Sequence, residues 1–105
     1  MQSGSLTYEL SKREGTTIVE PRGALDATTA KPLEETLAKV LQEGSCHVNL
    51  HLAQVPYITS VGLRAILMTA KECNRRSGKL TFSGLTEAVE QVFELAGFTT
   101  LFTIE

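Results

Sequence analysis

The sequence contains no tryptophan, few other aromatic residues and only two cysteines. Phenylalanine and tyrosine together make up 6 % of the 105 residues, so the aromatic platforms on which bases and sugars stack are scarce. Cys46 and Cys73 belong to no C-x-x-C motif, a pattern that favours reduced thiols in a cytosolic protein. No apolar run approaches the roughly 20 residues of a membrane span, so we expect no direct membrane insertion.

A large excess of one charge is also missing. Ten Lys and Arg residues stand against twelve Asp and Glu residues, a net charge of −2, which offers no electrostatic footprint for nucleic acid. The common phosphate-binding loops are absent as well, because the chain contains neither G-x-G-x-x-G nor G-K-[ST]. We therefore expect no nucleic-acid partner and no cofactor.

Length and composition indicate one domain over residues 1–105. Compact domains commonly have roughly 100–150 residues, and hydrophobic residues at 42 % of the chain suffice for a modest core. Residues 1–5 do not resemble a signal peptide, and we expect them to be flexible.

Hydrophobic periodicity predicts five strands and three helices. The predicted strands cover residues 6–12, 16–22, 46–52, 79–82 and 101–104. The predicted helices cover residues 27–43, 60–76 and about 85–96, opened by Asp26 or Thr28, by Thr59 or Ser60, and by Thr86 respectively. The order β-β-α-β-α-β-α-β implies an α/β domain with a mixed sheet. Strict alternation over 46–52 predicts a sheet that is covered on one face only.

Ser60 lies where a strand leads into the second predicted helix, and three interpretations apply. On geometry alone a helix N-cap is favoured, because Ser and Thr commonly satisfy the free backbone N–H groups there. A serine at a helix start can also accept a phosphate, since the helix dipole favours negative charge at that end. A catalytic nucleophile is disfavoured, because Ile58 replaces the first glycine of G-x-S-x-G and no histidine follows the serine. We therefore predict no catalytic residue and no enzymatic activity.

His47 and His51 are separated by four residues on a predicted strand, a span of roughly 13 Å. They cannot share one metal ion within that strand, so we interpret them as residues of a solvated sheet face and predict no metal site. The cations around the end of the second helix, including Arg75 and Arg76, fit a solvated helix end that complements the dipole.

Several separated motifs fall in a family-like order along residues 6–104. They are Gly23-x-Leu25-Asp26, His47-Val48-x-Leu50-x-Leu52-x-x-Val55-x-Tyr57-Ile58-x-Ser60-x-Gly62-Leu63, Gly78-Lys79-Leu80, Val92-x-Glu94-Leu95-x-Gly97-Phe98 and Leu101-Phe102. Together they resemble STAS domains, and within that superfamily they are most similar to bacterial anti-sigma factor antagonists. The resemblance implies a mixed four- to five-stranded sheet with helices packed chiefly on one face.

The resemblance also implies function by partner switching in the bacterial cytoplasm. The unphosphorylated domain would bind an anti-sigma factor that is a serine kinase of the histidine-kinase-like ATPase fold. Phosphorylation of the serine matching Ser60 would abolish binding, and a PP2C-type phosphatase would restore it. Phosphate brings about −1.5 to −2 charges, which a packed interface must desolvate.

The partner surface implied by the resemblance is the first turn of the second helix and the neighbouring turn. Its residues are Asp26, Thr59, Val61, Gly62, Leu63 and Arg64. For Asp26 we rate an N-cap role above a direct partner contact. The family usually carries aspartate where this chain has Thr59 and His51, and Thr59 is a second candidate acceptor. These departures motivate an alternative, a non-switching STAS accessory subunit of a lipid-transport ABC complex in which Ser60 is only a helix cap.

Overall fold

The computed structural model describes residues 6–105; the predicted flexibility of residues 1–5 lies outside the described residues. Its elements are β1 Thr7–Arg13, β2 Thr16–Arg22, α1 Ala30–Gln42, β3 His47–His51, α2 Ser60–Arg75, β4 Lys79–Ser83, α3 Glu87–Leu95, α4 Phe98–Leu101 and β5 Thr103–Ile104. The sheet order is β1-β2-β3-β4-β5. β1 is antiparallel to β2 and the other neighbours are parallel, which confirms the predicted mixed α/β sheet.

The hairpin turns at Glu14 and Gly15, which have φ angles of 53° and 85°. Two consecutive left-handed residues make the tight turn whose twist matches that of paired strands. β2 then leads through α1 to β3, and β3 leads through α2 to β4, as parallel strands require a crossover.

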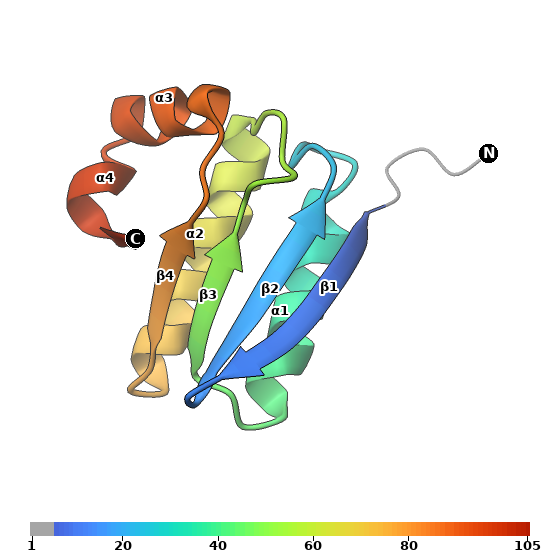
Figure 1. Ribbon diagram of the computed structural model, residues 1–105, viewed down its shortest axis with the longest axis vertical. Helices are drawn as coiled ribbons and strands as arrows, with labels where there is room; N and C mark the ends of the chain where they lie inside the picture. The colour runs from blue at the N-terminus through green and yellow to red at the C-terminus, as the bar shows by residue number, and fades with distance from the viewer. Residues whose placement is uncertain (1–5) are drawn as a thin grey trace.

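Helices α1 and α2 lie on one side of the sheet, and the other side faces the viewer uncovered in Figure 1. Val48 and Leu50 on β3 point to the helices and are buried, as the alternation predicted. They pack in one core with the inner faces of α1 and α2, including Leu33, Leu37 and Ile66. The predicted one-sided covering of β3 is therefore confirmed, with one difference: Asn49, on the uncovered side, is only 7 % exposed.

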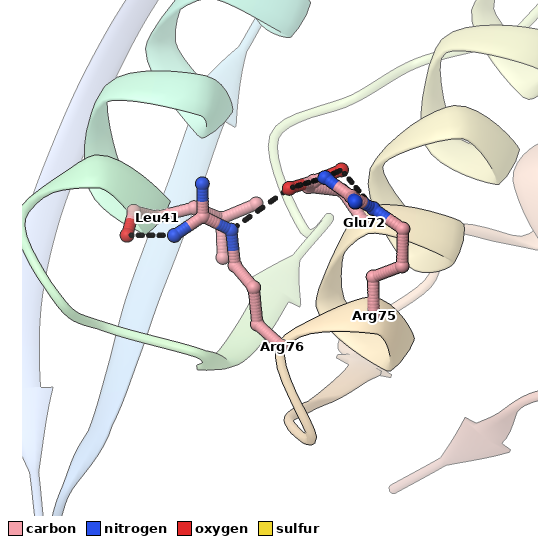
Figure 2. Close-up of polar contacts among 4 residues, drawn as sticks. All are labelled: Leu41, Glu72, Arg75 and Arg76. Carbon is pink, nitrogen blue, oxygen red and sulfur yellow. Dashed lines mark hydrogen bonds and ion pairs between the residues drawn. The ribbon is translucent and has the colours of Figure 1, made fainter.

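The carboxyl ends of α1 and α2 are joined by a charged cluster (Figure 2). Glu72 accepts hydrogen bonds from Arg75 and Arg76, at 2.9 Å each in their shortest contacts. Arg76 also donates to the backbone oxygen of Leu41 at the end of α1, at 3.3 Å. Hydrogen bonds from Arg76 and then Arg75 lower the pKa of Glu72 below its ordinary range. The cations thus do more than complement their own helix, because Arg76 adds a second hydrogen bond to the Leu41 carbonyl, which also accepts the Gly44 N–H.

Four phenylalanines attach the C-terminal segment to the sheet. Phe82 of β4 contacts Phe93 and Phe102 edge to face, with ring centroids 5.2 and 5.3 Å apart. Phe98 closes the ring with centroid distances of 5.2 Å to Phe93 and 5.0 Å to Phe102. Such edge-to-face pairs add about 0.5–1.5 kcal/mol each beyond the burial of their area.

This cluster explains a wrong strand boundary. We predicted a strand over 101–104, but Phe98–Leu101 form the short helix α4 and the strand is only Thr103–Ile104. Gly97, at φ 79°, reverses the chain after α3, and one further helical turn brings Phe98 and Phe102 to the same cluster. Packing of these rings outweighs the local β preference of the sequence.

The start of the first helix was also misplaced. α1 begins at Ala30 rather than residue 27, and neither Asp26 nor Thr28 is its N-cap, which is Thr29. The third helix agrees with its predicted cap, because the Thr86 hydroxyl accepts a hydrogen bond from the Val89 amide at 3.4 Å.

We expect Phe93→Ala to lower the free energy of unfolding by about 3–5 kcal/mol, because it leaves a cavity among buried rings. Leu95→Ala is the matched control. Leu95 is on the same helix and 90 % exposed, so this variant should change the free energy of unfolding by no more than about 0.5 kcal/mol. Urea unfolding curves of both variants measure the difference. Equal losses would show that the ring cluster is not part of the core.

Candidate functional site

A backbone contact places the loop after β2 against the start of α2. Leu25 donates its N–H to the oxygen of Tyr57 at 3.1 Å, and Thr59 donates its N–H to the oxygen of Leu25 at 2.9 Å. These bonds form an isolated parallel bridge between Leu25 and Ile58, both buried. The bridge brings together the two segments that carry the predicted partner surface.

Ser60 is the first residue of α2, and Thr59 occupies the N-cap position. The N-cap interpretation of Ser60 is therefore wrong. The Ser60 side chain is exposed and donates or accepts no side-chain hydrogen bond within residues 6–105. Its hydroxyl stands at the positive end of a 16-residue helix, where added negative charge is stabilised.

Thr59 is less accessible than Ser60. Its side chain is half-buried and caps no backbone N–H of the helix. The hydroxyl points to the Leu25 carbonyl, 3.5 Å away, a distance at the outer limit for a hydrogen bond.

Gly62 lets the loop and helix approach each other. A Cβ at this position would lie 2.5 Å from the Leu25 oxygen and 2.9 Å from Ile58 Cγ1. No other residue fits without a backbone shift, and Gly62 is itself buried. Its place in the predicted surface is thus beneath the exposed residues, as a spacer.

The exposed part of the first turn combines one hydroxyl, one apolar side chain and one cation. Val61 is 45 % exposed, Arg64 is exposed and Leu63 is half-buried. Two further apolar side chains, which the sequence reading did not single out, are Tyr57 at 50 % and Met68 at 51 % exposure. Met68 lies seven residues after Val61, on the same side of the helix. The i, i+7 spacing of Val61 and Met68 in the sequence could have identified Met68 as part of this exposed surface.

Asp26 organises the neighbouring turn. Its Oδ1 accepts hydrogen bonds from the Thr28 hydroxyl at 2.7 Å, the Thr28 amide at 3.0 Å and the Thr29 amide at 3.2 Å. The Thr28 hydroxyl bond is the main reason why the pKa of Asp26 lies below its ordinary value of 3.8. The Tyr57 hydroxyl reaches Oδ2 at 3.4 Å, so Asp26 also connects the turn to the segment before Ser60.

His51 is held on the uncovered side of the sheet. Its Nδ1 lies 2.9 Å from the Ser83 hydroxyl, and a side chain at Gly84 would collide with its ring. His51 is therefore fixed by β4 and the turn that follows it.

Comparison with known proteins assigns the whole fold to one family. The family model of the STAS domain matches residues 7–105. The chain belongs to the STAS domain family. The resemblance seen in the sequence motifs is thereby confirmed.

Curated relatives of this STAS domain are anti-sigma factor antagonists. The anti-sigma-B factor antagonist of Staphylococcus epidermidis is 35 % identical over 79 residues, covering 75 % of this chain and 73 % of the relative. BtrV of Bordetella bronchiseptica, a candidate anti-sigma factor antagonist, is 34 % identical over 95 residues, covering 90 % of this chain and 82 % of BtrV.

Solved structures share the fold at lower identity. An anti-sigma factor antagonist from Mycobacterium paratuberculosis superposes with a TM-score of 0.85 at 22 % identity, covering 98 % of this chain and 87 % of that one. SpoIIAA in its unphosphorylated form gives 0.71 at 13 % identity, with 94 % and 87 % covered. Among the helices described between residues 6 and 105 of this STAS domain, none has the length and hydrophobicity to cross a membrane.

Gly62→Ala should destabilise this STAS domain by about 1–3 kcal/mol, since the new methyl group must displace the Leu25 backbone or the helix. Val61→Ala, one residue away but exposed, should change the unfolding free energy by no more than about 0.5 kcal/mol. Chemical denaturation measures both. An unchanged Gly62→Ala midpoint would mean that the loop moves freely away from α2.

The carboxylate of Asp26 should make stability depend on pH. Because its folded-state pKa is depressed, the contribution is fully present above the unfolded pKa, near 4, and is lost as pH falls through the folded value. Wild type should therefore exceed Asp26→Asn in stability at neutral pH, with a gap that narrows below about pH 4. Thr28→Val, which removes the strongest donor, should reduce the same gap. Thermal melts across pH test this, and a constant gap would contradict it.

Proposed function

We propose that this STAS domain is an anti-sigma factor antagonist that acts by partner switching, with Ser60 as the phosphorylated residue. The observation that carries the proposal is an exposed hydroxyl on the first residue of α2, which makes no side-chain hydrogen bond within residues 6–105 and lies beside the exposed Val61 and Arg64. The names of its sequence relatives support the class of partner, an anti-sigma factor. That partner is inferred to be a serine kinase of the histidine-kinase-like ATPase fold, and the pair would act in the cytoplasm with a PP2C-type phosphatase.

The fold accommodates a phosphate at Ser60 without rearrangement. A phosphate on the first residue of a helix lies next to free backbone N–H groups and the positive end of the dipole. In a bound complex the same group would have to be desolvated against the partner's surface. Each 1.4 kcal/mol of that cost lowers affinity about tenfold, so release requires no change of fold.

The phosphorylated and unphosphorylated structures of SpoIIAA support this view. Each gives a TM-score of 0.71 against this chain, so the fold of that protein stays equally similar to this one in both states. The switch is therefore proposed to act through surface charge rather than through refolding.

The contact surface is proposed to be the exposed strip on α2 and the Asp26 turn. Val61 supplies apolar area, Arg64 supplies a cation, and Tyr57 bonded to Asp26 extends the strip beyond the helix. Thr59 takes a positioning role through the Leu25 carbonyl and is the second candidate acceptor. Gly62 and Leu63 hold the turn against the core.

The accessory-subunit alternative assigned Ser60 only a capping role. Ser60 follows the N-cap position, and its hydroxyl makes no bond in the described part of the chain. We therefore prefer the switching function, in which this free hydroxyl has a use.

The test is capture of the kinase from the native organism with three forms of the domain as bait. Wild type and Ser60→Ala should retain the kinase, whereas Ser60→Asp should lose it by about tenfold or more, because a buried charge costs at least 1.4 kcal/mol. Incubation with the captured kinase and ATP, followed by mass spectrometry, should place phosphate on Ser60.

Thr59→Val is the matched control and should still be phosphorylated. Phosphate on Thr59 in the Ser60→Ala variant would reassign the acceptor. Equal kinase binding by Ser60→Asp and wild type would refute the switch. Co-purification with a membrane transport complex, unaffected by Ser60→Ala, would instead favour the accessory-subunit function.

A further inference from the structure

The uncovered side of the sheet carries its polar residues in rows that cross the strands. Arg13 pairs with Thr16, and His47 pairs with Lys79. Because Thr17 pairs with Val48, Thr16 lies beside His47. These four residues therefore form one row across β1, β2, β3 and β4, on the side that faces the viewer in Figure 1.

Two further rows, two and four residues along the strands, form one hydrogen-bond network: Asn49 pairs with Thr81, and His51 pairs with Ser83. Asn49 donates from Nδ2 to the Thr81 hydroxyl at 2.9 Å and accepts from the Ser83 hydroxyl at 2.9 Å. Since the single proton of Ser83 is directed to Asn49, the His51 Nδ1 must donate to Ser83, 2.9 Å away. The network therefore has one direction, from His51 through Ser83 and Asn49 to Thr81.

This network leaves specific groups free to bind a ligand. The Thr81 hydroxyl proton, the second amide proton of Asn49 and His51 Nε2 make no bond among residues 6–105. Two of these groups donate and one accepts, which suits hydroxyl groups, since each hydroxyl both donates and accepts.

The first row adds positive charge. Arg13 and Lys79 are exposed and form no ion pair in the described chain. Arg13 on β1 and Lys79 on β4 are three strand spacings apart, about 14 Å, so the two long side chains can converge over Thr16 and His47, which lie between them. Glu14 stands at the margin of the same end, and Glu105 lies at the opposite end beside Ser83.

The three rows line a single hollow of about 720 Å³ on the sheet, within the range of small-molecule sites. Ile18 of β2 contributes an apolar side chain to its lining. We propose that this hollow, the sheet groove, binds a small hydroxylated anion of the sugar-phosphate class. The phosphate contacts Arg13 and Lys79, and the sugar hydroxyls contact Thr81 and Asn49.

The spacing of the rows sets the size of the ligand. Asn49 and Thr81 lie two residues along the strands from the first row, a span of about 6.6 Å, comparable to the separation between the phosphate and the far hydroxyls of a hexose phosphate. The groove is on the side of the sheet opposite α2, so the proposal is independent of phosphorylation at Ser60.

Titration of the ¹⁵N-labelled domain with glucose 6-phosphate, glucose and inorganic phosphate tests the groove. We expect glucose 6-phosphate to shift amides of the β1–β2 turn, β3 and β4, and to bind at least about tenfold more tightly than either part alone, because it engages the cations and the hydroxyl-binding groups together. Inorganic phosphate binding as tightly as glucose 6-phosphate would overturn the sugar contacts. Shifts confined to the first turn of α2, or no shifts, would overturn the site.

Variants separate the phosphate contacts from the sugar contacts. Arg13→Ala and Lys79→Ala should each weaken glucose 6-phosphate binding about two- to fivefold, the range of an exposed charge pair, while Thr81→Val should weaken glucose and glucose 6-phosphate but not phosphate. Lys71→Ala, an exposed cation outside the groove, is the control and should change nothing. An equal loss from Lys71→Ala would mean diffuse electrostatic attraction and would refute the site. Ser60→Ala should bind like wild type, which keeps this outcome separate from the switching function.

Discussion

The contact of the Leu25 backbone with the Tyr57–Thr59 segment is the constraint on which the proposed binding surface depends. Two hydrogen bonds of 3.1 and 2.9 Å join these segments, and a glycine at position 62 makes room for the Leu25 carbonyl. Since the Leu25 carbonyl accepts the Thr59 N–H, the start of α2 is fixed relative to the loop after β2. Ser60 then follows a turn held by these bonds, and its side chain is exposed.

The two sides of the sheet differ in composition and in contacts. The side under α1 and α2 contains the continuous apolar core, and the charged cluster of Glu72, Arg75 and Arg76 joins the ends of those helices. The opposite side keeps its polar groups in ordered rows, where Asn49 is almost fully buried and hydrogen-bonded to both Thr81 and Ser83. Such a network satisfies the buried polar groups on a sheet face that α1 and α2 do not cover. It also holds the remaining donors in fixed positions.

Thr59 and His51 stand where the family usually carries aspartate, and each has a defined structural role in this domain. His51 contributes to the polar network through Ser83, and Thr59 contributes its backbone N–H to the Leu25 contact while its side chain caps nothing. Neither residue places a negative charge near Ser60. The charge of the turn comes instead from Asp26, whose carboxylate is held by Thr28 and Thr29.

The element order, the mixed sheet and the one-sided core were predictable from the sequence, because alternation in β3 and three-and-four periodicity in α1 and α2 are local patterns that burial selects directly. The ordered motifs also identified the family and placed Ser60 at a helix start. Only the tertiary structure decided that Ser60 follows the N-cap rather than occupying it, since the cap position depends on where Leu25 meets Thr59. It also decided that Phe98–Leu101 form a helix, because the Phe98 and Phe102 rings must join the cluster around Phe82 of β4, and that Asn49, Ser83 and His51 share one network across β3 and β4. Such outcomes depend on contacts between segments far apart in the chain, which no local pattern encodes.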